Sequence, residues 1–302
     1  MSMLVLGSVA LDTIETEKGS AVDCLGGSAT HAALAASYFT RPSLVGVVGE
    51  DFPEEHHRFL AARVDLSELR ALPGRTFRWH GFHSLVTGKT TTKATELNTY
   101  AAFKPELSKR SRAATHVLLG NIDPELQLHV LEQLDGPTLV ACDTMSLWIE
   151  LSRSKVIEVM REVDLFLINE QESYELTGLD TVEEAGEAML RYGARSVIIK
   201  CGSRPSLLFA EGRRLAVPAV PGVDVTDPTG AGDNYAGALV GYMESRGAAA
   251  ADAADLIHGM HVGSATASYA IEDFGAEVHR RLTQADIERR LNVLLASQRS
   301  AG

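Results

Sequence analysis

Residues 225–235 read VTDPTGAGDNY, and residues 236–242 continue as AGALVGY. Pro228 ends any preceding helix or strand pairing, and the small residues at 230–232 let the backbone turn tightly. The small-residue run that follows predicts the start of a helix. A junction of this kind leaves several peptide N–H groups pointing at one spot, with the positive end of the helix dipole behind them. The stretch therefore predicts an anion-binding site.

Asp233 stands at the start of this predicted helix and has two interpretations. In the plainer one it is an N-terminal helix residue, which the dipole stabilises by about 0.3–1 kcal/mol. In the functional one, its carboxylate lies beside a phosphate-binding turn and accepts the proton of a hydroxyl that attacks a phosphoryl group. The motif alone leaves both open, and the residues around it favour the second.

Outward from this junction, short apolar runs alternate with stretches of helical period, a pattern typical of a parallel sheet covered by helices. The strands are near-continuous apolar runs, as expected when both sheet faces are buried. We expect strands at residues 3–9, 44–48, 116–119, 138–141, 165–168 and 196–200. We expect helices at residues 28–38, 53–63, 124–134, 156–162, 170–176 and 182–191 and, after a hairpin near 205–218, at 231–245, 251–269 and 284–296. The pattern predicts an α/β fold with a doubly wound, mostly parallel sheet.

Composition narrows the function classes. The chain has 302 residues, 45% hydrophobic and 23% charged, with 40 acidic and 28 basic residues and a net charge of −12. These fractions argue against disorder, and the acidic balance argues against nucleic acid or an anionic membrane as partner. The three cysteines have no metal-ligand or disulfide spacing, and Asp12 interrupts the apolar start of the chain before a signal or membrane span could form. We expect one domain over residues 1–302 and a cytoplasmic location.

Residues 75–103 break the α/β rhythm. TFRWH at 76–80 and TTTKAT at 90–95 alternate and are rich in threonine and aromatic residues, with a turn at 88–89 between them. Alternation places Phe77 and Trp79 on one face, away from Arg78 and His80. We expect a small β-sheet lid, with strands inserted at about 13–25 and 75–103, through which the chain forms a homodimer. An ordinary surface hairpin is the alternative.

The DPTGAGD segment at 227–233 resembles the carboxy-terminal signature of the ribokinase-like (pfkB) carbohydrate kinases. Three weaker motifs occur in the family's order: GSVALD at 7–12 resembles its first strand with a substrate-binding aspartate, LGGSATH at 25–31 its double-glycine segment, and NEQE at 169–172 its Asn-x-x-Glu element. Four ordered motifs spanning residues 7 to 233 make a chance match improbable. The resemblance implies a ribokinase-like fold.

The resemblance implies that the chain transfers a phosphoryl group from ATP, with Mg²⁺, to a hydroxyl of a small sugar or sugar derivative. Asp233 would be the general base, and the N–H groups of Gly230, Ala231 and Gly232 would form the anion hole. Alignment and charge stabilisation carry most of the acceleration in such a reaction.

The resemblance also implies a set of nucleotide-binding residues: Asn169, Gly202, Thr229, Gly230, Gly232 and Ser264. Lys200 is added because it ends a strand, where the loops of doubly wound sheets meet ligands. Asn169 and Glu172 would act on magnesium or its waters, although a capping box explains the same two residues. The family's second glycine after Gly202 is missing. Ser264 lies with Val262 and Ala267 in a small-residue helix that ordinary packing explains equally well. The loop at 271–275 is similar to a monovalent-cation site found in parts of the family.

For the acceptor, the resemblance points to Asp12, Gly26 and Gly27. Their places in the chain add His31 after the double glycine, Asn98 in the lid segment, and Asn121 and Asp123 in a loop between a strand and a helix. A carboxylate at a strand end, such as Asp12, accepts hydrogen bonds from two vicinal hydroxyls, or else caps a turn. His31 stands where many relatives have asparagine, and a packed, hydrogen-bonded histidine is its simpler interpretation. Asn121 and Asp123 lie in a loop before a helix, so either is also a candidate N-cap.

Other functions remain as alternatives. A nucleoside kinase on the same fold is favoured if aromatic lid residues, among them Phe77, Trp79, Tyr100 and Phe103, stack on a base. A nucleotide- or sugar-binding regulator without catalysis would not need Asp233. A Rossmann dehydrogenase is weaker still, because Gly7 has no Gly-x-x-Gly after it.

Overall fold

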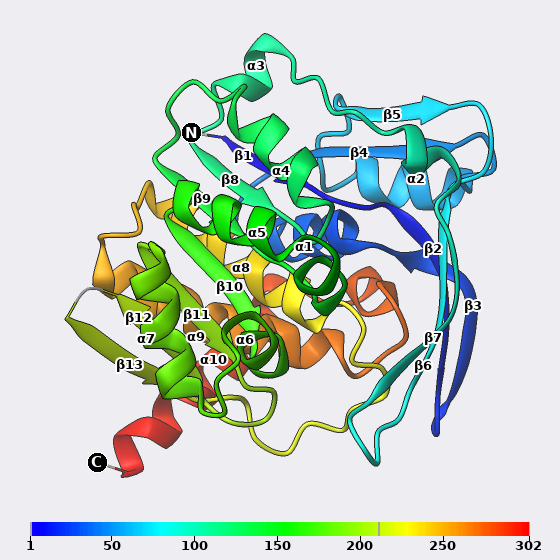
Figure 1. The fold of residues 1–302 in the computed structure, drawn as a ribbon. Helices are drawn as coiled ribbons and strands as arrows, with labels where there is room; N and C mark the ends of the chain where they lie inside the picture. Colours follow the sequence, from blue (N-terminus) through cyan, green and yellow to red (C-terminus); the bar gives the residue numbers. More distant parts are fainter. Residues whose placement is uncertain (1, 211, 302) are drawn as a thin grey trace.

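Two β-sheets organise the chain in the computed structural model, which describes residues 2–210 and 212–301. The larger sheet has nine strands in the order β13-β12-β11-β10-β9-β8-β1-β4-β5 (Figure 1). Its strands are β1 (Met3–Leu6), β4 (Ser43–Gly49), β5 (Leu69–Leu72), β8 (His116–Leu119), β9 (Leu139–Cys142), β10 (Leu165–Asn169), β11 (Ser196–Lys200), β12 (Ser206–Ala210) and β13 (Arg213–Val217). All its pairs are parallel except β11–β12 and β12–β13. The predicted doubly wound, mostly parallel sheet is confirmed.

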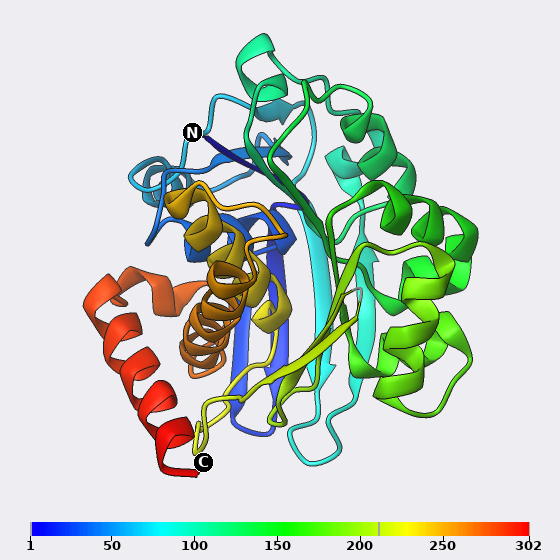
Figure 2. The same ribbon diagram turned by 90° about the vertical axis from the view of Figure 1, so that its left-hand side faces the viewer.

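Helices cover both faces of this sheet, which stands edge-on between them in Figure 2. One face carries α4 (Pro124–Leu131), α5 (Ser146–Glu162), α6 (Glu170–Thr177) and α7 (Val182–Tyr192). The other carries α1 (Ser28–Ala36), α8 (Ala231–Arg246) and α9 (Ala253–Ala270), with α10 (Gln284–Ala301) packed outside them. The short elements are α2 (Glu54–Ala61), α3 (Lys109–Arg112) and the 3-10 turns at Asn98–Ala102 and Glu277–Arg280. Alanines of α1 let α8 pack closely, since a Cβ on Gly237 would lie 2.1 Å from the Ala32 carbonyl oxygen.

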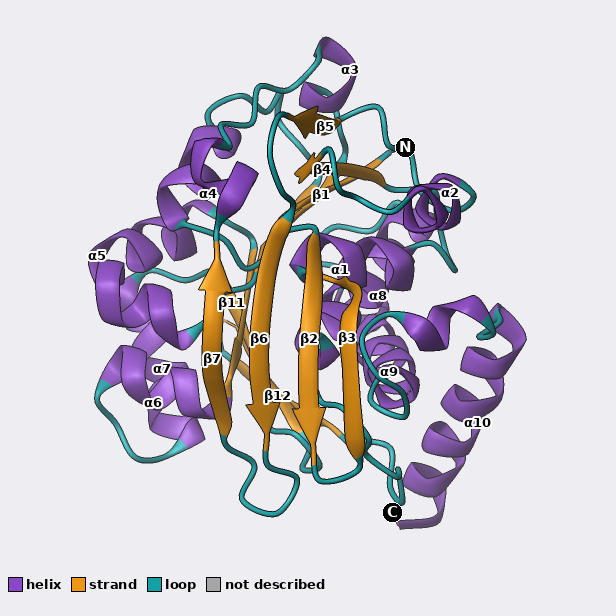
Figure 3. Ribbon diagram, turned by 90° about the vertical axis from the view of Figure 1, so that its right-hand side faces the viewer, coloured by secondary structure: helices purple, strands orange, loops and turns teal. Residues whose placement is uncertain are grey.

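The second sheet, called the lid sheet below, has four strands in the order β3-β2-β6-β7 (Figure 3). They are β2 (Ala10–Thr16), β3 (Gly19–Gly26), β6 (Phe77–His83) and β7 (Thr90–Glu96). Asp12 pairs with Trp79 in the parallel β2–β6 register, and paired residues of parallel strands point to the same face. The face that holds Asp12, a residue only 4% exposed, therefore also holds Phe77, Trp79 and His83.

Several expected boundaries differ. The strand expected at 3–9 ends at Leu6, because the chain leaves the large sheet there and its next apolar residues enter the lid sheet as β2. The helix expected at 156–162 begins at Ser146 and has a non-helical residue at Ser152. The half-exposed β5 and the polar α3 carry too little apolar periodicity to be predicted.

Two further findings concern membranes and cysteines. Within residues 2–210 and 212–301, no helix is long and apolar enough to cross a membrane. Cys24, Cys142 and Cys201 are free thiols and all are buried.

Candidate functional site

A cavity of about 650 Å³ opens where the carboxyl ends of β9, β10 and β11 meet the start of α8. The sequence-predicted residues that line it are Asn121, Asn169, Glu172, Lys200, Gly202, Ala231, Gly232, Asp233 and Ser264. In doubly wound sheets, ligands bind at the carboxyl ends of the strands, and a volume of this size suits a small organic ligand. The fold thus gathers one continuous site from separate parts of the chain.

The turn at residues 227–232, called the phosphate turn below, contains Gly230 as the N-cap of α8. Gly230 has φ 72°, in the left-handed region, and a Cβ there would lie 2.5 Å from the ring of His31. Both facts require glycine. Ala231 N–H donates to the Pro228 carbonyl oxygen at 3.2 Å, whereas no hydrogen bond to another described residue takes the N–H groups of Gly230 and Gly232. Two backbone donors and the helix dipole thus remain for an anion.

Lys200 places a cation directly behind the phosphate turn. Its Nζ donates to Asp143 Oδ2 at 2.5 Å, with side-chain exposures of 15% and 5%. A Cβ on Gly232 would lie 2.8 Å from the same Nζ, so only glycine lets the ammonium approach the turn this closely. Burial alone would lower the pKa of Lys200, but Asp143, Glu172 and Asp233 outweigh it and raise that pKa. Lys200 is therefore charged and held against the anion site.

Asp233 is the first acidic residue of α8 and lines the cavity. Burial, and then the Asp143 carboxylate, raise its pKa from 3.8 to about 7, while Lys200 acts in the opposite direction. A carboxylate with a pKa close to the working pH is suited to take and release a proton.

Asn169 and Glu172 form the capping box at the start of α6. Glu172 N–H donates to Asn169 Oδ1 at 2.9 Å, and Asn169 N–H donates to Glu172 Oε2 at 3.0 Å. This leaves the Asn169 amide NH₂, a donor, and one carboxylate oxygen of Glu172 for a ligand. Burial, and then Asp143, raise the pKa of Glu172 to about 7. Glu172 is therefore a buried carboxylate that a cation would stabilise, and Asn169 is better suited to a phosphate oxygen.

Asp12 reaches the same region from the lid sheet. Its Oδ1 is buried without a hydrogen-bond partner, and a Cβ on Gly26 would lie 2.0 Å from its Oδ2. Burial first, then Asp227 and, more weakly, Asp233 together raise its pKa to about 7. The fold thus brings Asp12 into the electrostatic field of Asp233, 221 residues away in the sequence. An unpaired buried acceptor atom of this kind calls for a donor.

His31 ends a buried chain of hydrogen bonds. Its Nδ1 lies 3.4 Å from Asn234 Nδ2, Asn234 Oδ1 lies 2.8 Å from His279 Nε2, and His279 Nδ1 lies 3.0 Å from the Tyr38 hydroxyl. Burial lowers the pKa of both histidines, to about 4 for His31 and about 3 for His279, so both are neutral. Tyr38 donates to His279, His279 to Asn234 and the Asn234 amide to His31 Nδ1, which assigns the His31 proton to Nε2. That Nε2–H is buried and without a partner. His31 is therefore an oriented donor as well as a packing residue.

Other predicted acceptor residues have structural partners. Asp123 caps α4 by accepting from Glu125 N–H at 2.9 Å. The Asn98 amide donates to the Thr76 carbonyl oxygen at 2.9 Å, at the base of the lid sheet and outside the cavity lining. Asn121 lines the cavity, where its Oδ1 accepts from Trp148 Nε1 at 2.9 Å. The structure thus does not bring Asn98 and Asp123 to the cavity.

The remaining predicted residues, Gly27, Ser264 and Thr229, also have structural roles. Gly27 has φ 94° and is the N-cap of α1. The Ser264 hydroxyl donates to the Pro218 carbonyl oxygen at 3.2 Å. Thr229 donates its hydroxyl to Asp227 Oδ1 at 2.5 Å and lies 2.8 Å from His83 Nε2. His83 was not predicted, because no local pattern links residues 146 positions apart.

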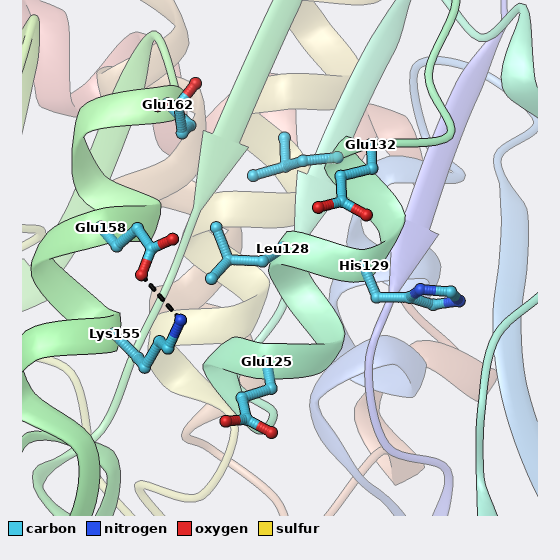
Figure 4. A pocket seen from close by; sticks show the side chains of 8 residues that line it. Glu125, Leu128, His129, Glu132, Lys155, Glu158 and Glu162 are labelled. Carbon is cyan, nitrogen blue, oxygen red and sulfur yellow. Dashed lines mark hydrogen bonds and ion pairs between the residues drawn. The ribbon is translucent and has the colours of Figure 1, made fainter.

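A second hollow, of about 560 Å³, lies between α4 and α5 (Figure 4). Glutamates dominate its lining, with Lys155 paired to Glu158 at 2.9 Å. None of the sequence-predicted site residues borders it, and among the described residues no three His, Cys, Asp or Glu side chains gather to hold a metal. The cavity at the phosphate turn is the candidate site.

Comparisons with known proteins bear on the family and the fold of the chain. Residues 3–280 match the family model described as pfkB family carbohydrate kinase. A cytidine kinase of Thermococcus kodakarensis is 30% identical over 260 residues, which span 82% of this chain and 90% of that protein. The fold is similar to that of Burkholderia thailandensis nucleoside kinase in complex with inosine (TM-score 0.79, 18% identity, 98% and 99% of the two chains). It is also similar to Arabidopsis thaliana ribokinase complexed with ribose and ATP (TM-score 0.74, 21% identity, 96% and 98%).

Proposed function

Because the chain belongs to the pfkB family of carbohydrate kinases, and is therefore a phosphotransferase, we propose that it transfers the γ-phosphoryl group of ATP to a hydroxyl of a sugar, free or within a nucleoside. The observation that supports this most is the convergence of Asp12 and Asp233. One carboxylate has an unpaired oxygen that suits a hydroxyl group, and the other stands at the anion-binding start of α8. Burial and Asp227 raise the pKa of Asp12 most, and Asp233 adds to the rise, so the two carboxylates lie within electrostatic range of each other.

The reaction divides among residues of the site. Asp233 accepts the proton of the acceptor hydroxyl as its oxygen attacks the γ-phosphorus. The bond from the γ-phosphorus to the oxygen bridging the β-phosphate breaks, and ADP leaves with that electron pair. The N–H groups of Gly230 and Gly232 and the ammonium of Lys200 face the charge of the transferring group.

Glu172 is the residue that fits a magnesium ion best. Its carboxylate is 7% exposed and retains an oxygen that the capping box does not use. No cage of three acidic or histidine side chains exists among the described residues, so Glu172 and water would hold the ion together with the phosphates of ATP. Bound there, Mg²⁺ neutralises phosphate charge.

A nucleoside acceptor is the second candidate. The Thermococcus kodakarensis protein that is 30% identical to this chain is named a cytidine kinase. Trp79 lies on the same face of the lid sheet as Asp12. The Trp79 ring lies over Gly81, where a Cβ would approach it to 2.0 Å, and 5.6 Å from the ring of His83. An aromatic surface beside the acceptor carboxylate suits a base or a sugar face.

Two further parts of the proposal concern assembly and ions. β3 and β7 are the edge strands of the lid sheet, and β7 is exposed throughout. We propose that pairing at this sheet forms a homodimer, which light scattering tests.

The loop at 271–275 is joined to the phosphate turn, because Gly275 N–H donates to Asp227 Oδ2 at 2.9 Å. A monovalent cation at this loop would make the rate depend on potassium when choline replaces it.

An acceptor screen tests the proposed function. ADP release is measured with ATP and Mg²⁺ against pentoses, hexoses, deoxy sugar acids and nucleosides, for the wild type and Asp233→Asn. We expect release with one acceptor class, and its loss in Asp233→Asn with ATP binding retained by calorimetry. Equal turnover in both proteins would contradict the base assignment, and no release above the acceptor-free rate with any class would contradict the function.

A further inference from the structure

A histidine of the lid sheet forms a hydrogen bond with the phosphate turn. His83 ends β6, and its Nε2 lies 2.8 Å from Thr229 Oγ1, while its Nδ1 lies 2.7 Å from Thr90 Oγ1 on β7. Figure 3 shows β6 and β2 running side by side toward the same end of the lid sheet. The side chain of His83 therefore joins two lid strands to the turn that begins α8.

The hydrogen bonds assign a direction to this connection. Thr229 has one hydroxyl hydrogen, which it donates to Asp227 Oδ1 at 2.5 Å, so its oxygen accepts from His83 Nε2–H. His83 Nδ1 is then an acceptor and takes the hydrogen of Thr90. Burial lowers the pKa of His83, which keeps this neutral tautomer in place.

The turn itself does not need His83 for its shape. Asp227 accepts from Thr229 N–H at 2.8 Å and from Gly275 N–H at 2.9 Å, and neither bond involves a residue of the lid sheet. The hydrogen bond from His83, called the tie below, therefore links the lid sheet to the phosphate turn, and the part that it positions is the lid sheet.

The ion pair of Lys18 with Asp224 is a weaker tie near this end of the lid sheet. It joins a lid turn to the loop beside the cavity, but the Asp224 side chain is 90% exposed, and exposed ion pairs contribute little. The half-buried His83 bond contributes more, because neutral hydrogen bonds away from water are worth more than screened surface pairs.

The strand register connects His83 to Asp12, the residue proposed to bind the acceptor. β6 pairs in parallel with β2 from Phe77 to Phe82, which places Trp79 beside Asp12. A movement of His83 away from Thr229 would carry Trp79 and Asp12 away from Asp233 together, because the three lid residues share one hydrogen-bonded sheet.

We propose that His83 is a positioning residue, which holds the lid sheet on the phosphate turn and so sets the distance between the acceptor and the base. This inference rests on the proposed function for its kinetic consequence only. Loss of the hydrogen bond from His83 raises the KM for the acceptor more than the KM for ATP, because the cavity lining includes no residue of the lid strands, although Thr229 is itself a predicted nucleotide-binding residue.

The test compares three variants. His83→Leu removes the donor, and His83→Gln keeps an N–H at similar reach. His80→Leu is the matched control, since His80 lies on the same strand but the opposite face, where its Nε2 is 2.7 Å from Glu15. We expect the acceptor KM to rise roughly 3- to 10-fold in His83→Leu, to recover in part in His83→Gln and to stay near wild type in His80→Leu. If the KM for ATP and the KM for the acceptor rose by the same factor in His83→Leu, the positioning role would be overturned.

A second measurement does not depend on activity. Amide hydrogen exchange of residues 77–96 reports opening of the lid sheet. We expect faster exchange there in His83→Leu than in His80→Leu, and no further change when His83→Leu is added to Thr229→Val, because the partner is already lost. Unchanged lid exchange in His83→Leu would refute the tie, whereas a protein without kinase activity but with faster exchange would refute the proposed function alone.

Discussion

Replacing Asp12 by asparagine should make the protein more stable at pH 8 while weakening its acceptor site. Burial, Asp227 and Asp233 raise the pKa of Asp12 from 3.8 to about 7. Between these two values the folded state binds more protons than the unfolded state, so stability falls as the pH rises through this window and is constant above it. The ionised Asp12 thus destabilises the folded protein at pH 8 and not below pH 4.

The size of the effect follows from the shift. A rise of about three pKa units, at about 1.4 kcal/mol each, makes the ionised form cost about 4 kcal/mol above pH 7 and about 1.5 kcal/mol at pH 5. The asparagine side chain of the variant would carry no charge, but it keeps one acceptor oxygen where the carboxylate has two, beside the N–H groups of Gly27 and Trp79, which costs about 1 kcal/mol at every pH. We therefore expect a net stabilisation of about 3 kcal/mol at pH 8 and near zero at pH 5.

Urea denaturation followed by circular dichroism measures this difference. The wild type and Asp12→Asn are compared at pH 5 and pH 8, with Asp135→Asn as the control, because Asp135 is exposed in a loop and does not line the cavity. The acceptor KM is measured in parallel and should rise about tenfold or more, since one hydroxyl loses its acceptor. A stability difference between wild type and Asp12→Asn that is the same at both pH values would refute the reasoning.

Three other outcomes test the site. Because Asp233 must be ionised to accept a proton and has a pKa raised to about 7, kcat/KM should fall about tenfold per unit below pH 7; a flat profile from pH 5 to 8 would count against it. Gly232→Ala should displace Lys200, whose Nζ lies 2.8 Å from the added Cβ, and lower kcat about 100-fold with folding retained; near-normal kcat would exclude a role for this approach. His279→Leu should lower the free energy of unfolding by about 2–4 kcal/mol, because it leaves the buried Tyr38 hydroxyl and Asn234 Oδ1 without their partner. A loss under about 0.5 kcal/mol would mean that these hydrogen bonds do not stabilise the fold.

The sheet, its flanking helices and the start of α8 follow from local patterns. Apolar runs buried on both faces became strands, and the glycine-rich turn became the N-terminus of α8. The predicted capping alternative for Asn169 and Glu172 is seen in the structure, since its four partner atoms lie within four consecutive residues. The short β5 and the first part of α5, which is separated from the rest by the non-helical Ser152, were missed, because tertiary contacts override a weak local signal there.

Local chemistry therefore accounts for the phosphate turn, whose backbone donors, left-handed glycine and helix start all belong to one short segment. Which distant groups meet that turn is decided by the crossovers of the sheet and by the lid sheet. The approach of Lys200 to Gly232, the field of Asp233 on Asp12 and the bond from His83 to Thr229 join residues 32 to 221 positions apart. Propensity and spacing act over a few residues, so they cannot select such partners; packing of the whole chain brings them together and sets their pKa values and tautomers.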